Sequence, residues 1–129
     1  MKGKTGDKPT ALTAIQPKDL VLPPVATWFS RWFVLTAGDM KKFNSMTVAW
    51  GSIGGMWEMP FVQVVVRPTR HTFGFMNDFP EFTLCSFPAR YRRDLGILGS
   101  KSGRDTDKIA LTRLTPTRSR AVAAPCFRE

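Results

Sequence analysis

Three apolar runs lie close together between residues 27 and 68, and the short connections between them constrain the fold more than any other feature of the sequence. Residues 27–36 are rich in aromatic and β-branched side chains. Residues 45–55 form a second run that ends in glycines, and residues 59–68 form a third that Pro68 ends. Such runs predict β-strands. Parallel neighbours need a crossover of a dozen or more residues, which these connections cannot supply, so we expect antiparallel pairing.

The second half of the chain mixes helices with further strands. Residues 69–78 predict a short helix with Thr69 as its N-cap, and residues 81–88 alternate as a strand does. Residues 88–98 predict a helix that begins at a proline, and residues 121–127 a last strand. We therefore expect a mainly β fold with peripheral helices, arranged as an antiparallel, Greek-key-like barrel.

A chain of 129 residues is expected to form one domain. Residues 1–26 are polar and end in a proline-rich stretch that predicts an extended arm, so the domain is expected to span residues 27–129. The formal net charge is +9, which fits nucleic acid, an anionic surface or a phosphorylated ligand, and equally fits solvated basic faces.

The sequence argues against several classes of site. Cys85 and Cys126 form no CxxC pair, and His71 is the only histidine, which disfavours a structural zinc site and a serine-protease-type triad. No secretory signal is recognisable, and no stretch approaches the roughly 20 apolar residues of a membrane span. We expect reduced thiols, no membrane partner and a cytoplasmic location.

Two segments place polar residues where a predicted strand begins or ends. In "NSMTVAWGS", Asn44 and Thr47 can turn an amide and a hydroxyl toward a ligand, although an ordinary strand would look the same. In "VRPTRHT", Arg67 and Arg70 flank the predicted helix start at Thr69. A helix N-terminus and forked guanidinium groups suit a phosphate, and a capped surface helix with solvated arginines is the alternative.

A third segment, "KSGRDTDK", combines three basic side chains with two aspartates. Lys101 and Ser102 can hold phosphate oxygens, while the aspartates are expected to pair with Arg104 and Lys108 and to fix the loop. A solvated charged loop is the alternative. Together the three segments suggest a phosphorylated organic ligand.

Flat apolar side chains are available for a planar ring. Trp50, Trp57 and Phe61 are the candidates for such a surface, whereas Trp28 and Trp32 are expected to belong to the core.

These segments resemble the flavin reductase-like family, on its flavoredoxin branch. The resemblance rests on N-x-M-T-x-x-W-G, V-R-P-[ST]-R-x-T and S-G-R-D-x-D-K in this order, and it extends over residues 33–129. It implies an FMN-binding split β-barrel that works as a homodimer. It also implies ten cofactor-binding residues: Asn44, Met46, Thr47, Trp50, Arg67, Thr69, Arg70, Thr72, Lys101 and Ser102.

The resemblance further implies an oxidoreductase, either an NAD(P)H-dependent flavin reductase or a flavoredoxin-like electron-transfer protein. FMN is the expected cofactor and a nicotinamide nucleotide the expected electron donor. The flavin would supply the chemistry, so no catalytic side chain is assigned. The alternatives are a non-catalytic flavin-binding protein and, more remotely, a basic barrel that binds nucleic acid. Members of the family continue beyond the point that matches residues 121–129, so we expect a barrel that is incomplete at its C-terminus.

Overall fold

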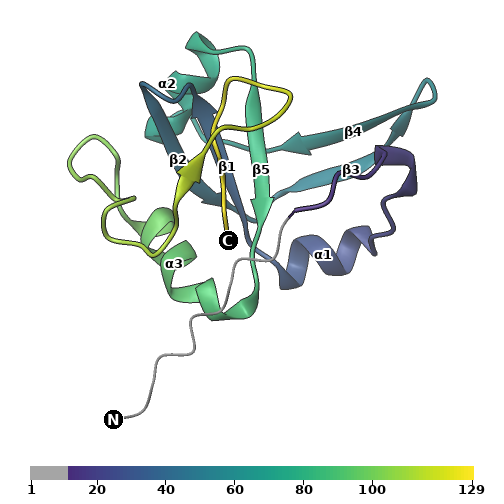
Figure 1. The fold of residues 1–129 in the computed structure, drawn as a ribbon, viewed down its shortest axis with the longest axis horizontal. Coiled ribbons are helices and arrows are strands. Elements are labelled where there is room, and N and C mark those ends of the chain that lie inside the picture. The colour runs from purple at the N-terminus through teal and green to yellow at the C-terminus, as the bar shows by residue number, and fades with distance from the viewer. Residues whose placement is uncertain (1–11) are drawn as a thin grey trace.

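The computed structural model describes residues 12–129 (Figure 1). Its elements in chain order are η1 (Pro17–Asp19), α1 (Pro24–Ser30), β1 (Phe33–Gly38), β2 (Phe43–Val48), β3 (Gly51–Met56), β4 (Met59–Val64), α2 (His71–Asp78), β5 (Phe82–Ser86), η2 (Ala89–Tyr91), α3 (Arg92–Ser100), β6 (Pro116–Thr117) and β7 (Cys126–Phe127).

The centre of the molecule is a three-stranded antiparallel sheet in the order β2-β1-β5. Every residue of β1 is buried, because the strand is paired on both edges and covered on both faces. The turn from β1 to β2 is held by Asp39, whose carboxylate accepts hydrogen bonds from the backbone N–H groups of Lys41 and Lys42 at 2.7 and 2.8 Å. Gly38 enters this turn with φ +117°, a conformation that L side chains rarely adopt.

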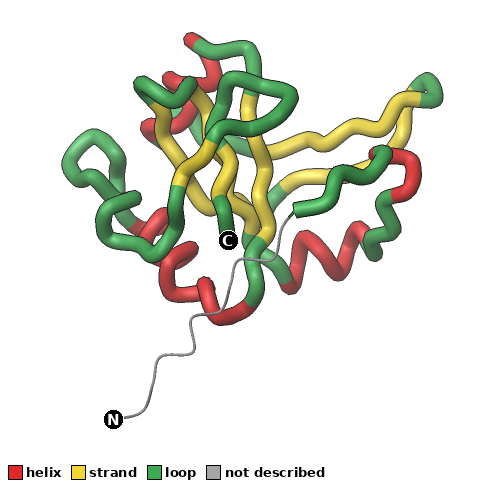
Figure 2. The backbone as a smooth tube through the Cα atoms, in the orientation of Figure 1, coloured by secondary structure: helices red, strands yellow, loops and turns green. Residues whose placement is uncertain are grey.

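Strands β3 and β4 form a separate two-stranded hairpin that extends away from the central sheet (Figures 1 and 2). A two-residue turn joins them, and both of its residues, Trp57 and Glu58, have positive φ of 50° and 59°. Two such residues are the signature of a type I′ hairpin turn, which favours Asn-Gly. The side chain of Trp57 at the tip is 89% exposed.

Two helices cover the two faces of the sheet. α2 packs on β1 and β2, and a hydrogen bond from Asn44 Nδ2 to Thr72 Oγ1 at 2.7 Å joins it to β2. α3 packs on the opposite face of β2, where the Thr47 hydroxyl donates to the Leu95 carbonyl oxygen at 2.5 Å. Successive residues of a strand point to opposite faces, so β2 contacts a helix on each side.

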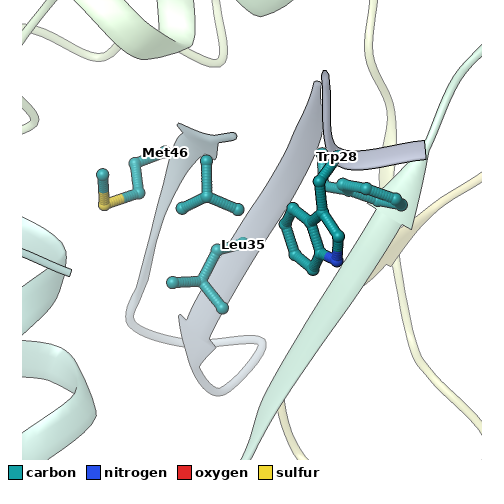
Figure 3. Close-up of a cluster of buried hydrophobic side chains, with 5 residues drawn as sticks. Trp28, Leu35 and Met46 are labelled. Carbon is teal, nitrogen blue, oxygen red and sulfur yellow. The ribbon is translucent and has the colours of Figure 1, made fainter. Parts of the chain in front are cut away.

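The buried apolar side chains form two clusters, one on each face. The first, shown in Figure 3, gathers Trp28 from α1 with side chains of β1 and β2, among them Leu35 and Met46. The second joins Val34 to Leu95 and Leu98 of α3 and to the C-terminal segment. The sheet is thus the shared wall of two small cores.

The C-terminal segment after α3 consists mostly of turns, drawn as loops in Figure 2. It is tied down by side-chain bonds: the Glu129 carboxylate accepts from the N–H and hydroxyl of Thr115, and Glu81 accepts from Ala123 N–H at 2.9 Å. No helix in the described part of the chain is both long and apolar enough to cross a membrane.

The expected fold class is confirmed: the structure is mainly antiparallel sheet with helices outside it, and residues 12–129 do not form a closed barrel. The predicted strands at 59–68 and 81–88 and the predicted helices at 69–78 and 88–98 are present, as β4, β5, α2 and α3.

Four local predictions are wrong. The strand predicted at residues 121–127 is reduced to its last two residues, β7. The predicted strand 27–36 starts as helix α1, because Pro24 stands at the first helical position, where a missing N–H costs nothing. The run 45–55 is broken at Ala49 and Trp50 into β2 and β3. The residue that caps α2 is Arg70 rather than Thr69, and it does so without a side-chain hydrogen bond. The division between arm and domain at residue 26 stays a prediction, although α1 spans that position and residues 1–11 lie outside the description.

Candidate functional site

A cavity of about 370 Å³ borders the outer edge of β2. Its walls come from the β2–β3 junction, the β4–α2 connection and the inner side of α3. Five of the ten predicted cofactor-binding residues line it: Met46, Thr47, Trp50, Arg67 and Arg70. Two of the predicted segments, far apart in the sequence, therefore meet here. We call this space the β2-edge cavity.

The free edge of β2 gives this cavity backbone hydrogen-bonding groups. In the described residues β2 pairs with β1 only, and Met46–Val48 border the cavity. The outer edge of such a strand carries N–H and C=O groups without a ladder partner. These groups suit a planar ligand whose rim alternates hydrogen-bond donors and acceptors.

Helix α3 approaches β2 closely at one glycine and leaves room at another. A Cβ added to Gly99 would lie 3.2 Å from Thr47 Cβ, which is tighter than ordinary contact. A Cβ added to Gly96, which also lines the cavity, would meet no atom within 4 Å. Gly99 thus permits the helix to pack, whereas Gly96 keeps part of the cavity open.

Positive charge gathers where the cavity meets the end of α3. Arg70 Nη1 lies 3.5 Å from the Gly99 carbonyl oxygen. The side chain of Lys108 is buried, and its Nζ donates to the carbonyl oxygens of Leu98 and Lys101 at 3.1 and 3.2 Å. Burial, with the charge of Arg70 nearby, lowers the pKa of Lys108 to about 8. No carboxylate is among the described side chains that line the cavity, so an anion would meet attraction only.

Asn44 and Thr72, two other predicted residues, lie together but do not line the β2-edge cavity. Both are buried and bonded to each other, and the Asn44 amide oxygen lies 2.1 Å from where a Gly103 Cβ would stand. Asn44 and Gly103 border a neighbouring hollow of about 410 Å³ with Lys42 and Lys108. The first and third predicted segments therefore meet at this second place.

The remaining predicted residues have structural contacts here. Ser102 Oγ accepts from Arg104 N–H at 3.2 Å, and Thr69 O accepts from Arg104 Nη1 at 3.4 Å. Lys101 is exposed. The expected pairing of Lys108 with an aspartate is wrong, because its Nζ binds the two carbonyl groups at the end of α3 instead.

Comparison with known proteins identifies the fold. No family model matches the chain, and no curated protein matches it. Solved structures do match it, among them the following three. An FMN-binding domain of a flavin reductase-like enzyme from Shewanella baltica OS155 has a TM-score of 0.68 and 17% identity over 77% of the chain. The flavoredoxin of Desulfovibrio vulgaris (Miyazaki F) has a TM-score of 0.68 and 26% identity over 98%. A split barrel domain classed among the flavin reductases, from Shewanella frigidimarina NCIMB 400, has a TM-score of 0.65 and 18% identity over 88%.

The chain has a flavin reductase-like split-barrel fold. The resemblance to this family is therefore confirmed. The chain spans 52%, 61% and 60% of the lengths of these three structures.

Sequence reasoning missed several residues of the split barrel that line the β2-edge cavity. They are Trp32, which the strand pattern assigns to the core, and Leu95, Gly96, Gly99 and Ser100 of α3. The signal for α3 is the pair of glycines at i and i+3 in "GILG", a spacing that leaves one helix face without side chains. Trp32 carries no such signal, because a buried aromatic and a cavity wall look alike in a strand pattern.

Proposed function

We propose that this chain binds FMN in the β2-edge cavity, with Arg67 and Arg70 toward the phosphate and Met46, Thr47 and Trp50 beside the ring system. The observation that carries the proposal is the meeting of two arginines, an aromatic wall and an unpaired strand edge in one cavity. The likeness to an FMN-binding domain and to a flavoredoxin supports the same ligand.

The residues present fit such a ligand. The cavity volume lies within the range of roughly 300–1,000 Å³ that small-molecule sites occupy. Its wall at Gly96 is open where any side chain would intrude. Two guanidinium groups without a lining carboxylate suit a phosphate dianion.

The proposed activity is electron transfer through the flavin, with NAD(P)H as donor. Bound FMN supplies the hydride and one-electron chemistry, and the protein's part is to hold the ring and to tune it with hydrogen bonds. The Thr47 hydroxyl, fixed by its bond to Leu95 O, and the outer edge of β2 are the groups positioned to do this. Asn44 and Thr72, bonded to each other, would act indirectly by holding α2, and with it Arg70, against β2.

A binding comparison between FMN and riboflavin tests the proposal. The full chain is incubated with FMN and desalted, and its absorbance spectrum is recorded. Dissociation constants for both flavins follow from the quenching of flavin fluorescence. We expect FMN to remain with the protein and to bind more tightly than riboflavin, because only FMN carries a phosphate.

Matched variants locate the phosphate. Arg70→Gln is expected to weaken FMN binding about tenfold and to leave riboflavin binding unchanged. The control is Arg93→Gln, which alters an exposed α3 arginine outside the cavity. A protein that retains neither flavin, or an Arg70→Gln variant that still prefers FMN to the same degree, contradicts the site. Flavin binding without oxidation of NADH or NADPH would favour a carrier that receives electrons from another source.

We also propose a homodimer in which a second copy covers the β3–β4 hairpin. A two-stranded hairpin is marginal on its own in water. Here Met56, Trp57 and Met59 expose 63%, 89% and 63% of their surface at its end. Trp50 lies at the base of the hairpin and lines the β2-edge cavity, so a copy seated there would also border the flavin.

Sedimentation over a range of protein concentrations tests the dimer. Trp57→Ser combined with Met59→Ser is expected to shift the equilibrium to monomer. Leu111→Ser, at an exposed apolar position outside the hairpin, is the control and should leave the dimer intact. A wild-type chain that stays monomeric at all concentrations would refute the dimer.

A further inference from the structure

A second and larger cavity, of about 690 Å³, adjoins the β2-edge cavity. It lies between the segment that enters β1 and the segment that leads from β5 through η2 into α3. Arg31, Trp32, Phe87 and Arg92 are among its walls. Trp32 and Leu95 line both cavities, so the two spaces lie next to each other. We call the second space the Arg92 cavity.

The Arg92 cavity is lined by positive charges that no described lining carboxylate neutralises. Arg31 and Arg92 both line it, and no carboxylate is among its described lining residues. The acidic residue nearest to Arg92 along the chain is Asp94, and its Oδ2 already forms an ion pair with Arg113 Nη2 at 2.7 Å. Within residues 12–129 neither Arg31 nor Arg92 forms an ion pair. An anionic ligand would therefore not have to displace an existing partner.

Arg92 is held in place by an aromatic ring. Its guanidinium carbon lies 3.4 Å from the centre of the Trp32 ring, the distance of a stacked pair. Stacking occupies one face of the guanidinium and leaves the N–H groups of its rim free to bind. A planar guanidinium with a fixed orientation binds phosphate oxygens through two parallel hydrogen bonds and loses less side-chain freedom in doing so.

We infer that the Arg92 cavity binds the phosphate-bearing adenylate half of a nicotinamide dinucleotide. This inference rests on the proposed flavin site. A donor that places its redox-active ring against a ligand in the β2-edge cavity must put the rest of its length elsewhere. The Arg92 cavity shares Trp32 and Leu95 with that cavity, and its two arginines can meet the bridging phosphates. Phe87 and Trp32 add aromatic surface for the adenine base.

ADP-ribose is the probe, because it contains the adenylate half and the bridging phosphates but no redox ring. Its binding to the FMN-loaded full chain is measured by calorimetry, and FMN affinity is measured separately for each variant. We expect ADP-ribose to bind and inorganic pyrophosphate to compete with it. Arg92→Gln should weaken ADP-ribose binding about tenfold or more and leave FMN affinity unchanged.

Two further variants sharpen the test. Arg31→Gln should weaken ADP-ribose binding in the same direction, and Arg93→Gln, an exposed arginine one position along α3 that does not line the cavity, should not. Arg92→Lys keeps the charge and loses the planar stack, so it should bind ADP-ribose more weakly than wild type and more tightly than Arg92→Gln. The unfolding temperature of each variant shows whether its fold is intact.

The outcomes separate this inference from the proposed function. A protein that retains FMN but does not bind ADP-ribose, or one in which the Arg92 and Arg93 variants behave alike, overturns the assignment of the Arg92 cavity and leaves the flavin site standing. A protein that does not retain FMN overturns the flavin site itself.

Discussion

The carboxylate of Asp94 is buried in α3 and accepts three hydrogen bonds from a single residue, Arg113. The bonds come from the Arg113 backbone N–H at 3.0 Å, from Nε at 3.1 Å and from Nη2 at 2.7 Å. Arg113 Nη2 also donates to the Arg90 carbonyl oxygen at 2.6 Å. This arrangement fastens the C-terminal segment to the helix that walls both cavities. Burial by itself would raise the pKa of Asp94, but the bonds from Arg113 hold it below 3.8.

Asp94→Asn is expected to lower the free energy of unfolding by about 1–2 kcal/mol at neutral pH, since the charge-assisted bonds are lost. The figure is modest because the Arg113 side chain is 61% exposed and water screens the pair. A lowered carboxyl pKa stabilises the folded state above the usual Asp value. The difference between wild type and variant should therefore shrink as the pH falls below 3.8. Denaturant unfolding at several pH values measures it.

Asp105→Asn is the control for that experiment. Asp105 is exposed on the loop after α3, and its loss is expected to change stability by no more than about 0.5 kcal/mol. A difference between wild type and Asp94→Asn that does not depend on pH would contradict the ionic part of the bond.

Lys108 predicts a trend of the same sign on the alkaline side. Its pKa is lowered from 10.5 to about 8, so between these pH values the unfolded chain binds more protons than the folded one. The contribution of Lys108 to stability should then rise with pH, by at most about 1.4 kcal/mol per pH unit for one proton. Lys108→Met removes this term. The stability of wild type relative to the variant is expected to increase from pH 8 to 10.5, and a constant difference would count against the burial of the ammonium group.

Two helical glycines provide a matched pair for the flavin cavity. A Cβ added to Gly96 or to Gly74 would meet no atom within 4 Å, but Gly96 lines the β2-edge cavity and Gly74 lies on α2 away from it. Leucine favours a helix over glycine by roughly 0.5–1 kcal/mol, so both substitutions should preserve or raise the unfolding temperature. Only Gly96→Leu is expected to weaken FMN binding, by about tenfold or more, because its side chain fills the cavity. Equal affinities in the two variants would place the flavin elsewhere.

The turn of the β3–β4 hairpin predicts a stabilising substitution. Glu58 has φ 59°, which costs a residue with a Cβ about 1 kcal/mol, so Glu58→Gly should raise the free energy of unfolding by roughly 0.5–1 kcal/mol. Gly38→Ala provides the reverse case: its Cβ would lie 2.2 Å from the Lys42 carbonyl oxygen, at φ +117°. That variant is expected to be destabilised by more than about 1 kcal/mol. Thermal unfolding of both variants compares the two signs directly.

Much of the fold could be predicted because strand alternation and helix periodicity are local signals. β5 and α3 follow directly from such patterns. Helix α1 could not be predicted in the same way, since prolines at 23 and 24 forbid a helix interior but permit a helix start. The division of residues 45–55 into β2 and β3 could not be predicted either. The break falls at Ala49 and Trp50, and neither is a residue type typical of turns.

Five of the ten residues predicted from the sequence to bind the cofactor line the β2-edge cavity. Arg67 and Arg70 belong to one short motif, so their side chains could be predicted to lie together. They share the cavity with Thr47 because the elements that carry them are neighbours in the fold. The contribution of α3 depends on which face of that helix meets β2, which tertiary packing decides. The contacts of Lys108 could not be predicted, because a charged loop favours ion pairs, whereas the free carbonyl groups at the end of α3 are better partners for a buried ammonium group.

The place of β1 between β2 and β5 also sets an order of assembly. β1 pairs with β2 across the short turn at Asp39. Its pairing with β5 closes a much longer loop, which contains β2, β3, β4 and α2. Closing a long loop costs more entropy than closing a short one, so the first pairing precedes the second. Until β5 arrives, the most apolar strand of the chain has one uncovered edge, which neighbouring chains can extend. We therefore expect soluble yield to depend on the interval between these two pairings, before either cavity has formed.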